Sequence, residues 1–261
     1  MARPVPRSSR VEWGLAARRA LSLGRRGKVI ARFERSFYVA TGGGLACVGA
    51  PGLGRGPLNM LVPELNAMPE LKECVSCTKN EVRFASGLTL PIQGAVLWRP
   101  VPAPAFGREA LPSIKRIFPA ESEALGYWIA KGASGRGPAL AARLVGMGSG
   151  LTPAGDDLIG GALIALRAVG NQRVANRLAK WALRLARSRT NRISFAHLSC
   201  AASGQGHEAL HHALNAILSG RRHLRNELQA LKRIGHSSGM DALSGALLAL
   251  NVTADRLHSN P

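Results

Sequence analysis

A cluster of prolines divides this chain into two stretches with different hydrophobic periods. Five prolines fall between residues 100 and 119: Pro100, Pro102, Pro104, Pro112 and Pro119. Proline fixes φ and lacks an amide donor, so neither a helix nor a central strand is expected to run through this stretch. A chain of 261 residues is long enough for one large domain or two modest ones. We therefore predict a domain boundary here.

The stretch before the prolines has the pattern of short strands. Apolar and β-branched residues fill positions 29–33 and 36–39, on either side of a tight turn. Residues 80–98 contain two or three further strand-like runs that Gly and Pro separate. This pattern predicts a β-rich N-terminal region.

After Pro119 the apolar residues recur three and four positions apart, which is the period of an amphipathic helix. Three stripes follow this period: Val174, Leu178, Trp181 and Leu185, then Leu210, Leu214, Ile217 and Leu218, then Leu224, Leu228 and Leu231. We therefore predict an α+β protein with a β-rich N-terminal region and an α-helical C-terminal domain. The predicted parts are a basic arm over 1–27, a β-rich domain over 28–105, a Pro-rich linker over 106–118 and an α-helical domain over 119–261.

The chain is strongly basic, with 35 Lys and Arg against 15 Asp and Glu and a formal net charge of +20. Residues 1–35 hold ten basic and two acidic side chains, and residues 171–235 hold twelve and two. No apolar run approaches the ~20 residues of a membrane span, and four cysteines do not describe a disulfide scaffold. We expect a cytoplasmic protein whose basic surfaces meet anionic substrates and partner proteins.

Two stretches of the helical half repeat each other. Residues 155–166 and 239–250, offset by 84 positions, are identical at seven of twelve positions, including Asp157 with Asp241 and Gly161 with Gly245. Three of the four aspartates in the chain fall in these two units. Each unit follows a loop rich in Gly and Ser, so the repeat predicts two similar helix starts.

Local signals place the beginnings of these two helices. Thr152 before Pro153 suits an N-cap followed by proline at the first helical position. Ser238 and Asp241 have the spacing of a capping box. The plain interpretation is that these residues cap two helices and that Gly161 and Gly245 only allow close packing.

The first loop favours a ligand site over a plain helix start. Residues 146–150 contain three glycines, and Ser, Thr and two aspartates accompany them. Amides of such a loop and of a helix N-terminus bind anions, whereas adjacent carboxylates attract a cation or an N–H donor. We expect a small polar ligand with both kinds of group, or an anion bridged by Mg²⁺. The loop matches neither a Walker motif nor a dinucleotide fingerprint.

The motif Gly-x-Gly-x-Gly-Leu-Thr-Pro-Ala-Gly-Asp-Asp-Leu, which begins at Gly146, resembles the signature of the AllH family, a subunit of oxamate carbamoyltransferase in allantoin catabolism. Two further stretches agree with the family, namely Arg189-Thr190-x-x-x-Ser194 with a following Ala202-x-Gly204, and residues 235–241. The resemblance spans about residues 140–250. It implies transfer of a carbamoyl group between oxalurate and phosphate, giving oxamate and carbamoyl phosphate. It also implies an assembly with two other kinds of subunit, without which the chain alone is not expected to be active.

The loop chemistry then suggests roles for individual residues. Asp156 or Asp157 would accept a hydrogen bond from the carbamoyl NH₂ or hold a metal ion, and His236 would act as a proton carrier at neutral pH. Backbone amides would stabilise the oxyanion of a tetrahedral intermediate. The remaining predicted binding residues are Gly148, Ser149, Gly150, Thr152, Gly155, Ser237, Ser238, Gly239 and Asp241. No covalent nucleophile is expected, and Mg²⁺ is the one candidate cofactor.

Two rival functions rest on other residues. His207, Glu208 and His211 satisfy the H-E-x-x-H zinc pattern, although no third ligand has the right spacing. A basic helical face, formed by Arg173, Arg177, Lys180, Arg184 and Arg187, would suit nucleic acid. Aromatic residues are only 5% of the chain, which disfavours stacking on bases. The same face would equally serve an acidic partner subunit.

Overall fold

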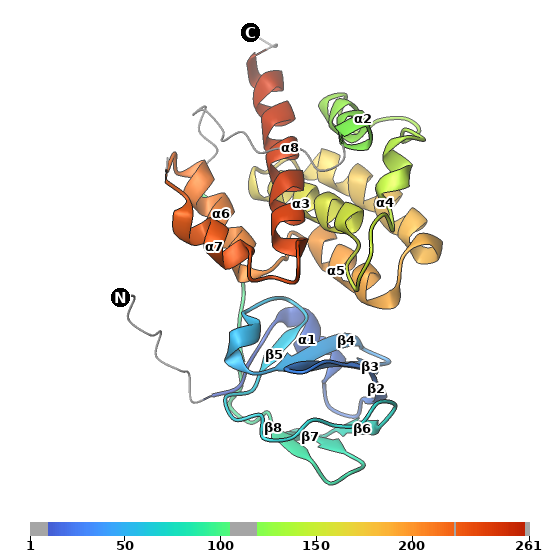
Figure 1. Cartoon of the computed structure of the whole chain (residues 1–261), viewed down its shortest axis with the longest axis vertical. Coiled ribbons are helices and arrows are strands. Elements are labelled where there is room, and N and C mark those ends of the chain that lie inside the picture. The colour runs from blue at the N-terminus through green and yellow to red at the C-terminus, as the bar shows by residue number, and fades with distance from the viewer. Residues whose placement is uncertain (1–9, 105–118, 222, 259–261) are drawn as a thin grey trace. The chain divides into compact units, whose positions relative to one another are not determined.

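The computed structural model of the chain describes residues 10–104, 119–221 and 223–258. The chain divides into two compact units, Met1–Arg99 and Pro100–Pro261. The first unit is built around a β-sheet and the second from helices (Figure 1). The predicted α+β class and the order of its two parts are therefore confirmed. The Pro-rich linker predicted over 106–118 lies outside the described residues.

Nine strands of the described chain form one mixed sheet, in the order β8-β7-β6-β2-β3-β4-β5-β1-β9. The strands are β1 (Glu12–Trp13), β2 (Arg26–Arg32), β3 (Ser36–Thr41), β4 (Gly44–Gly49), β5 (Asn59–Leu61), β6 (Cys74–Cys77), β7 (Glu81–Phe84), β8 (Thr89–Pro91) and β9 (Val96–Leu97). β4 with β5 and β1 with β9 are parallel pairs, and the other neighbours are antiparallel.

The strands form where the apolar pattern predicts them. β2 and β3 are the hairpin expected around residues 33–36, and the amide of Phe33 donates to the carbonyl of Ser36 at 2.8 Å. Residues 80–98 contain the three short strands β7, β8 and β9. Side chains of several strands, among them Val29, Phe37 and Met60, form the core of this unit.

Residues 10–27, assigned by their charge to a basic arm, supply two elements of the sheet unit. β1 pairs with β5 and β9. The helix α1 (Leu15–Ala20) buries Ala17 and Ala20 in the core beside Leu21. A few apolar side chains between the basic ones are enough to fix this segment, because each of them is fully buried.

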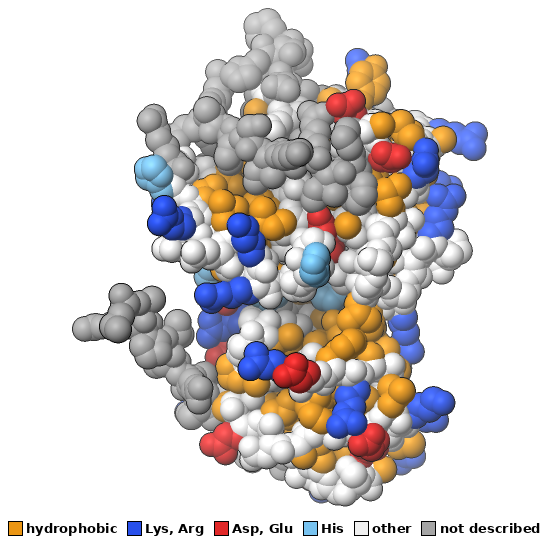
Figure 2. Space-filling model, in the orientation of Figure 1, with side chains coloured by type: hydrophobic (Ala, Val, Ile, Leu, Met, Phe, Trp, Pro, Cys, Tyr) orange, Lys and Arg blue, Asp and Glu red, His pale blue; other side chains and the backbone are white. Residues whose placement is uncertain are grey.

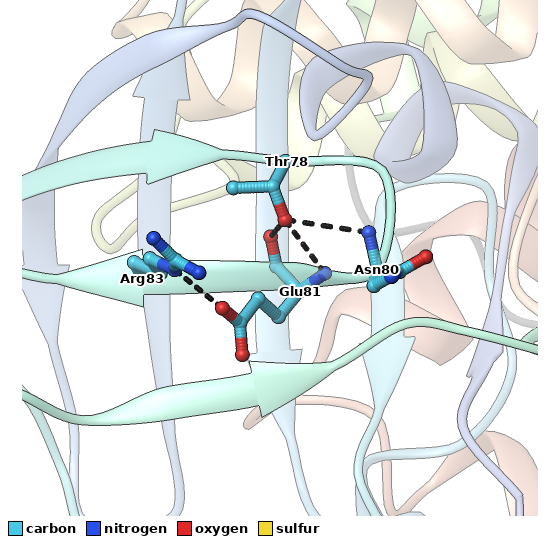
Figure 3. Close-up of polar contacts among 4 residues, drawn as sticks. All are labelled: Thr78, Asn80, Glu81 and Arg83. Atoms are coloured by element: carbon cyan, nitrogen blue, oxygen red, sulfur yellow. Dashed lines mark hydrogen bonds and ion pairs between the residues drawn. The ribbon is translucent and has the colours of Figure 1, made fainter.

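A polar turn joins β6 to β7 (Figure 3). The hydroxyl of Thr78 accepts hydrogen bonds from the amides of Asn80 at 3.3 Å and Glu81 at 3.1 Å. Glu81 in turn forms an ion pair with Arg83 on the same strand. The threonine side chain thereby replaces backbone partners where the chain reverses.

The second unit contains the helices α2 (Pro119–Ala130), α3 (Ala154–Ala168), α4 (Gln172–Arg189), α5 (Arg192–Ala202), α6 (Glu208–Leu218), α7 (Arg225–Leu231) and α8 (Ser238–His258), with a 3₁₀ turn η2 (Ala141–Leu144). The three predicted stripes lie on α4, on α6 and along α7 with the residue before it, and most of their residues are buried in one core. Among the described residues, no helix combines the length and the apolar character that crossing a membrane would require.

The two repeated segments become α3 and α8, which cross each other (Figure 1). A Cβ atom on Gly161 would lie 1.8 Å from the carbonyl oxygen of Ala242, and one on Gly245 would lie 1.7 Å from that of Leu158. The 84-residue offset relates Gly161 to Gly245 and Leu158 to Ala242, so the two contacts are equivalent under the repeat. Reciprocal contacts of this kind are the mark of a two-fold relation, so α3 and α8 are packed with local pseudo-two-fold symmetry.

The crossing yields a sharp prediction about stability. Gly161→Ala should lower the free energy of unfolding by about 1–3 kcal/mol or more, because the new methyl group overlaps a backbone carbonyl. Gly160→Ala is the matched control, since its Cβ would meet Ala201 at an ordinary 3.6 Å. The control should be neutral or more stable by up to about 1 kcal/mol from helix propensity. Urea unfolding of both variants checks this, and equal effects would contradict the crossing.

Candidate functional site

The glycine-rich loop connects η2 to α3. Gly146 has a φ of 77°, and a Cβ atom there would lie 2.0 Å from the carbonyl oxygen of Arg189 at the end of α4. Only glycine combines the left-handed backbone with this close approach. The loop is therefore fixed at one end against α4, while residues 148–151 are exposed.

The exposed part of the loop offers backbone donors. Within the described chain, the amides of Gly148, Ser149 and Gly150 donate to no protein acceptor. Gly148 and Gly150 have φ values of 114° and 97°, outside the range of most residues. Successive amides next to a helix N-terminus are suited to binding an anion.

Asp156 is a buried acceptor that ties three segments together. It is 2% exposed, and its Oδ1 accepts a hydrogen bond from the amide of Gly146 at 2.8 Å. Its Oδ2 accepts from the hydroxyls of Thr190 and, at 2.6 Å, of Ser194. Two of the sequence motifs, 146–158 and 189–194, therefore meet at one carboxylate. Thr190 and Ser194 were absent from the predicted site, although the R-T-x-x-x-S pattern had already singled them out.

Asp157 and Asp241 occupy equivalent places on the two crossing helices. Each has one buried oxygen, Oδ2 of Asp157 and Oδ1 of Asp241, for which the described chain provides no hydrogen-bond partner. Asp241 is 1% exposed, and its other oxygen accepts from the hydroxyl of Ser237 at 2.8 Å. Buried polar atoms are nearly always paired in folded proteins, so two unpaired oxygens at equivalent positions are a notable exception.

The two helix starts are in direct contact through their hydroxyls. Thr152 and Ser238 lie 2.8 Å apart, Oγ1 to Oγ. Burial raises the pKa of Asp157 to about 8; hydrogen bonds from Ser238 and Thr152 oppose this rise, and the charge of Asp241 adds to it. Burial also raises the pKa of Asp241 above its ordinary value.

The predicted capping roles of two residues are wrong. α3 begins one residue later than expected, with Pro153 as an N-cap that makes no side-chain hydrogen bond, and Thr152 contacts Ser238 instead. Ser238 does not form a capping box with Asp241, because Ser237 holds that carboxylate. The extended backbone of Pro153, with a ψ of 138°, explains the first difference. Pairing between the two helix starts, which lie far apart in the sequence, explains the Thr152–Ser238 contact.

The other predicted site residues have structural or surface positions. A Cβ atom on Gly155 would lie 2.0 Å from the carbonyl oxygen of Leu144 at the end of η2, and one on Gly239 would lie 2.2 Å from that of Leu231 at the end of α7. Each glycine therefore lets the preceding helical element approach closely. His236 is exposed on the turn before α8. Among the described residues, no group of three or more His, Cys, Asp or Glu could hold a metal ion.

The H-E-x-x-H residues have other contacts. His207 is the N-cap of α6, and its Nδ1 accepts from the amide of Ala209 at 3.3 Å. The Nε2 of His211 accepts from the amide of Gly206 at 3.1 Å. Burial lowers the pKa of His211 to about 4, which keeps this ring neutral. These contacts do not support the zinc peptidase interpretation.

The hydrogen bonds to Asp156 predict that the loop depends on Thr190. Thr190→Val, which replaces the hydroxyl by a methyl group of similar size, should lower the free energy of unfolding by about 1–3 kcal/mol, because a buried carboxylate loses a donor. Ser188→Ala, an exposed position on the adjoining turn, should change it by less than about 0.5 kcal/mol. Denaturant unfolding compares the two, and an equal loss in both would refute the role of Thr190.

Comparisons with known proteins agree with the motifs that meet at this site. No curated protein and no solved structure matches the chain. A family model does match, and its description is oxamate carbamoyltransferase subunit AllH. The matched range, residues 144–250, contains the glycine-rich loop, both crossing helix starts and their three aspartates, Asp156, Asp157 and Asp241. By this match, residues 144–250 of the chain are similar to the AllH family.

Proposed function

We propose that this chain is a subunit of an oxamate-type carbamoyltransferase and that the starts of α3 and α8 bind its small anionic substrate. One observation carries the proposal: the family match encloses a loop with free amides and two carboxyl groups that each have one buried, unpaired oxygen. Amides suit the anionic end of oxalurate or carbamoyl phosphate, and carboxyl oxygens suit the N–H groups at the other end.

The reaction needs few groups from the protein. A phosphate oxygen forms a bond to the carbamoyl carbon, the bond from that carbon to the nitrogen of oxamate breaks, and this nitrogen takes the proton that phosphate gives up. The tetrahedral intermediate carries an oxyanion, which amides of residues 148–150 would stabilise. The N-terminus of α3, where these amides lie, adds a favourable dipole for negative charge.

We assign different roles to the polar residues of the site. Asp156 is a positioning residue, because its acceptors are occupied by the loop and by α5. Asp157 touches the substrate, and Thr152 and Ser238 hold it in place. His236 exchanges protons with solvent at the exposed edge, and Ser149 adds a hydroxyl contact. Mg²⁺, if it takes part, arrives with the phosphate, since these side chains do not form a metal site by themselves.

We further propose that α4 binds an acidic partner subunit. Arg173, Lys180, Arg184 and Arg187 are exposed on this helix, which contains no acidic residue. On the face shown in Figure 2, Lys and Arg are more abundant than Asp and Glu over the helical unit. A surface with one sign of charge accelerates and orients association with an oppositely charged protein. The AllH family is described as a subunit of an enzyme, so a partner subunit is expected.

A carbamoyl-transfer assay with the assembled subunits tests the site. Asp157→Asn should reduce the rate by about 10–100-fold, because one hydrogen bond to a carboxyl group contributes about 1.5–3 kcal/mol. Glu121→Gln, which alters a 3.8 Å ion pair with Arg143 and none of the residues assigned to the site, is the control and should leave the rate unchanged. Full activity of a folded Asp157→Asn assembly would remove Asp157 from the mechanism.

Charge reversal tests the partner surface. Glutamate at Lys180, Arg184 and Arg187 together should weaken binding of the partner subunits by about tenfold or more, since like charges would then face each other. Glutamate at Arg35, Lys72 and Lys79, three exposed basic residues of the sheet unit, is the matched control. Titration by size-exclusion chromatography measures both. Binding of the unmodified chain to nucleic acid, lost with the same reversal on α4, would favour the nucleic-acid alternative.

A further inference from the structure

The pseudo-two-fold symmetry of α3 and α8 applies to the carboxyl groups as well as to the backbone. Asp157 immediately precedes Leu158, and Asp241 immediately precedes Ala242, and these two neighbours make the reciprocal contacts of the crossing. Each aspartate presents one unpaired buried oxygen. The two halves of the repeat therefore contribute the same chemical group at equivalent positions of two helix starts, which the Thr152–Ser238 contact joins.

The chain does not satisfy these oxygens itself. Leaving a buried acceptor without a donor is unfavourable, and here two acceptors are involved. The charge of Asp241 raises the pKa of Asp157, so the two carboxyl groups are within electrostatic range of each other. Their arrangement is unfavourable without a ligand, and donors shared between them would relieve it.

The chemistry of Asp157 and Asp241 limits which functional groups a ligand can present to them. Carboxyl oxygens accept hydrogen bonds, so the ligand must present N–H or O–H groups at this point. Among the described residues, no group of three or more His, Cys, Asp or Glu could hold a metal ion, so the pair is not part of a metal site made by the protein alone. An NH₂ group has two N–H bonds in one plane, which fits one acceptor on each side.

We propose that Asp157 and Asp241 jointly bind the NH₂ of a carbamoyl group, one N–H donating to Oδ2 of Asp157 and the other to Oδ1 of Asp241. This assignment rests on the proposed function. It gives Asp241 the same role in substrate specificity as Asp157. The free amides of residues 148–150 bind the anionic end of the same ligand. The pair thus selects carbamoyl compounds over acyl compounds of the same shape and charge.

Selection of this kind has a physical basis. A site with buried acceptors rejects an analogue that lacks the matching donors, because the acceptors would stay unpaired in the complex. Acetyl phosphate is such an analogue of carbamoyl phosphate, with CH₃ in place of NH₂. It keeps the phosphoryl group, so contacts with the loop amides are the same for both compounds.

Calorimetric titration of the full chain with each compound tests the proposal. The unmodified chain should bind carbamoyl phosphate at least about tenfold more tightly than acetyl phosphate, because each hydrogen bond to the pair contributes about 1.4 kcal/mol or more. Asp157→Asn and Asp241→Asn should each reduce this preference several-fold and leave acetyl phosphate binding within about twofold. Acetyl phosphate thereby also reports that each variant remains folded. Glu121→Gln should keep the full preference.

Four outcomes would overturn the proposal: equal affinity for the two compounds, no binding of either, an Asp241→Asn variant that keeps the full preference, or a preference that requires Mg²⁺. The transfer assay separates this proposal from the proposed function. A preference for carbamoyl phosphate without any effect of Asp157→Asn on transfer would leave the binding pair standing and reject the function. If Asp157→Asn abolishes transfer but the unmodified chain does not prefer carbamoyl phosphate to acetyl phosphate, the proposed function stands and the binding pair is rejected.

Discussion

The contact between the backbones of α3 and α8 determines the rest of the helical unit. Gly161 and Gly245 allow each helix to touch a carbonyl of the other, where any side chain would keep them apart. Because the contact lies less than two turns from both N-termini, the two helix starts converge and Thr152 reaches Ser238. The site is therefore a consequence of helix packing, with both halves of a sequence repeat required to form it.

Two adjacent aspartates in this structure have opposite environments. Successive residues of a helix point about 100° apart, so Asp156 is directed toward the loop and α5 while Asp157 faces the second helix start. Asp156 accepts three hydrogen bonds from the chain, and an oxygen of Asp157 accepts none. The first carboxylate makes the loop rigid, and the second is available to a ligand, so one Asp-Asp pair serves both structure and binding.

The sequence predicted those features that depend on local patterns. The change of period at the prolines separated strands from helices, and the three leucine-rich stripes marked buried helix faces. The 84-residue repeat located α3 and α8, although it did not reveal that they cross. Local patterns do not predict contacts between residues that are distant in sequence, such as the hydrogen bond from Thr190 to Asp156, 34 residues away. The cap at Thr152 failed for the same reason, since its partner Ser238 is 86 residues away.

The charge of the chain and its few aspartates act at different ranges. A net charge of +20 attracts any anion over about a Debye length, roughly 8–10 Å, and does so without regard to its chemistry. It cannot distinguish carbamoyl phosphate from acetyl phosphate, which have equal charge. Discrimination requires groups that lose more when the wrong ligand binds, and buried unpaired acceptors are groups of this kind. Arginine and lysine therefore raise the concentration of anions near the chain, whereas Asp157 and Asp241 determine which anion binds.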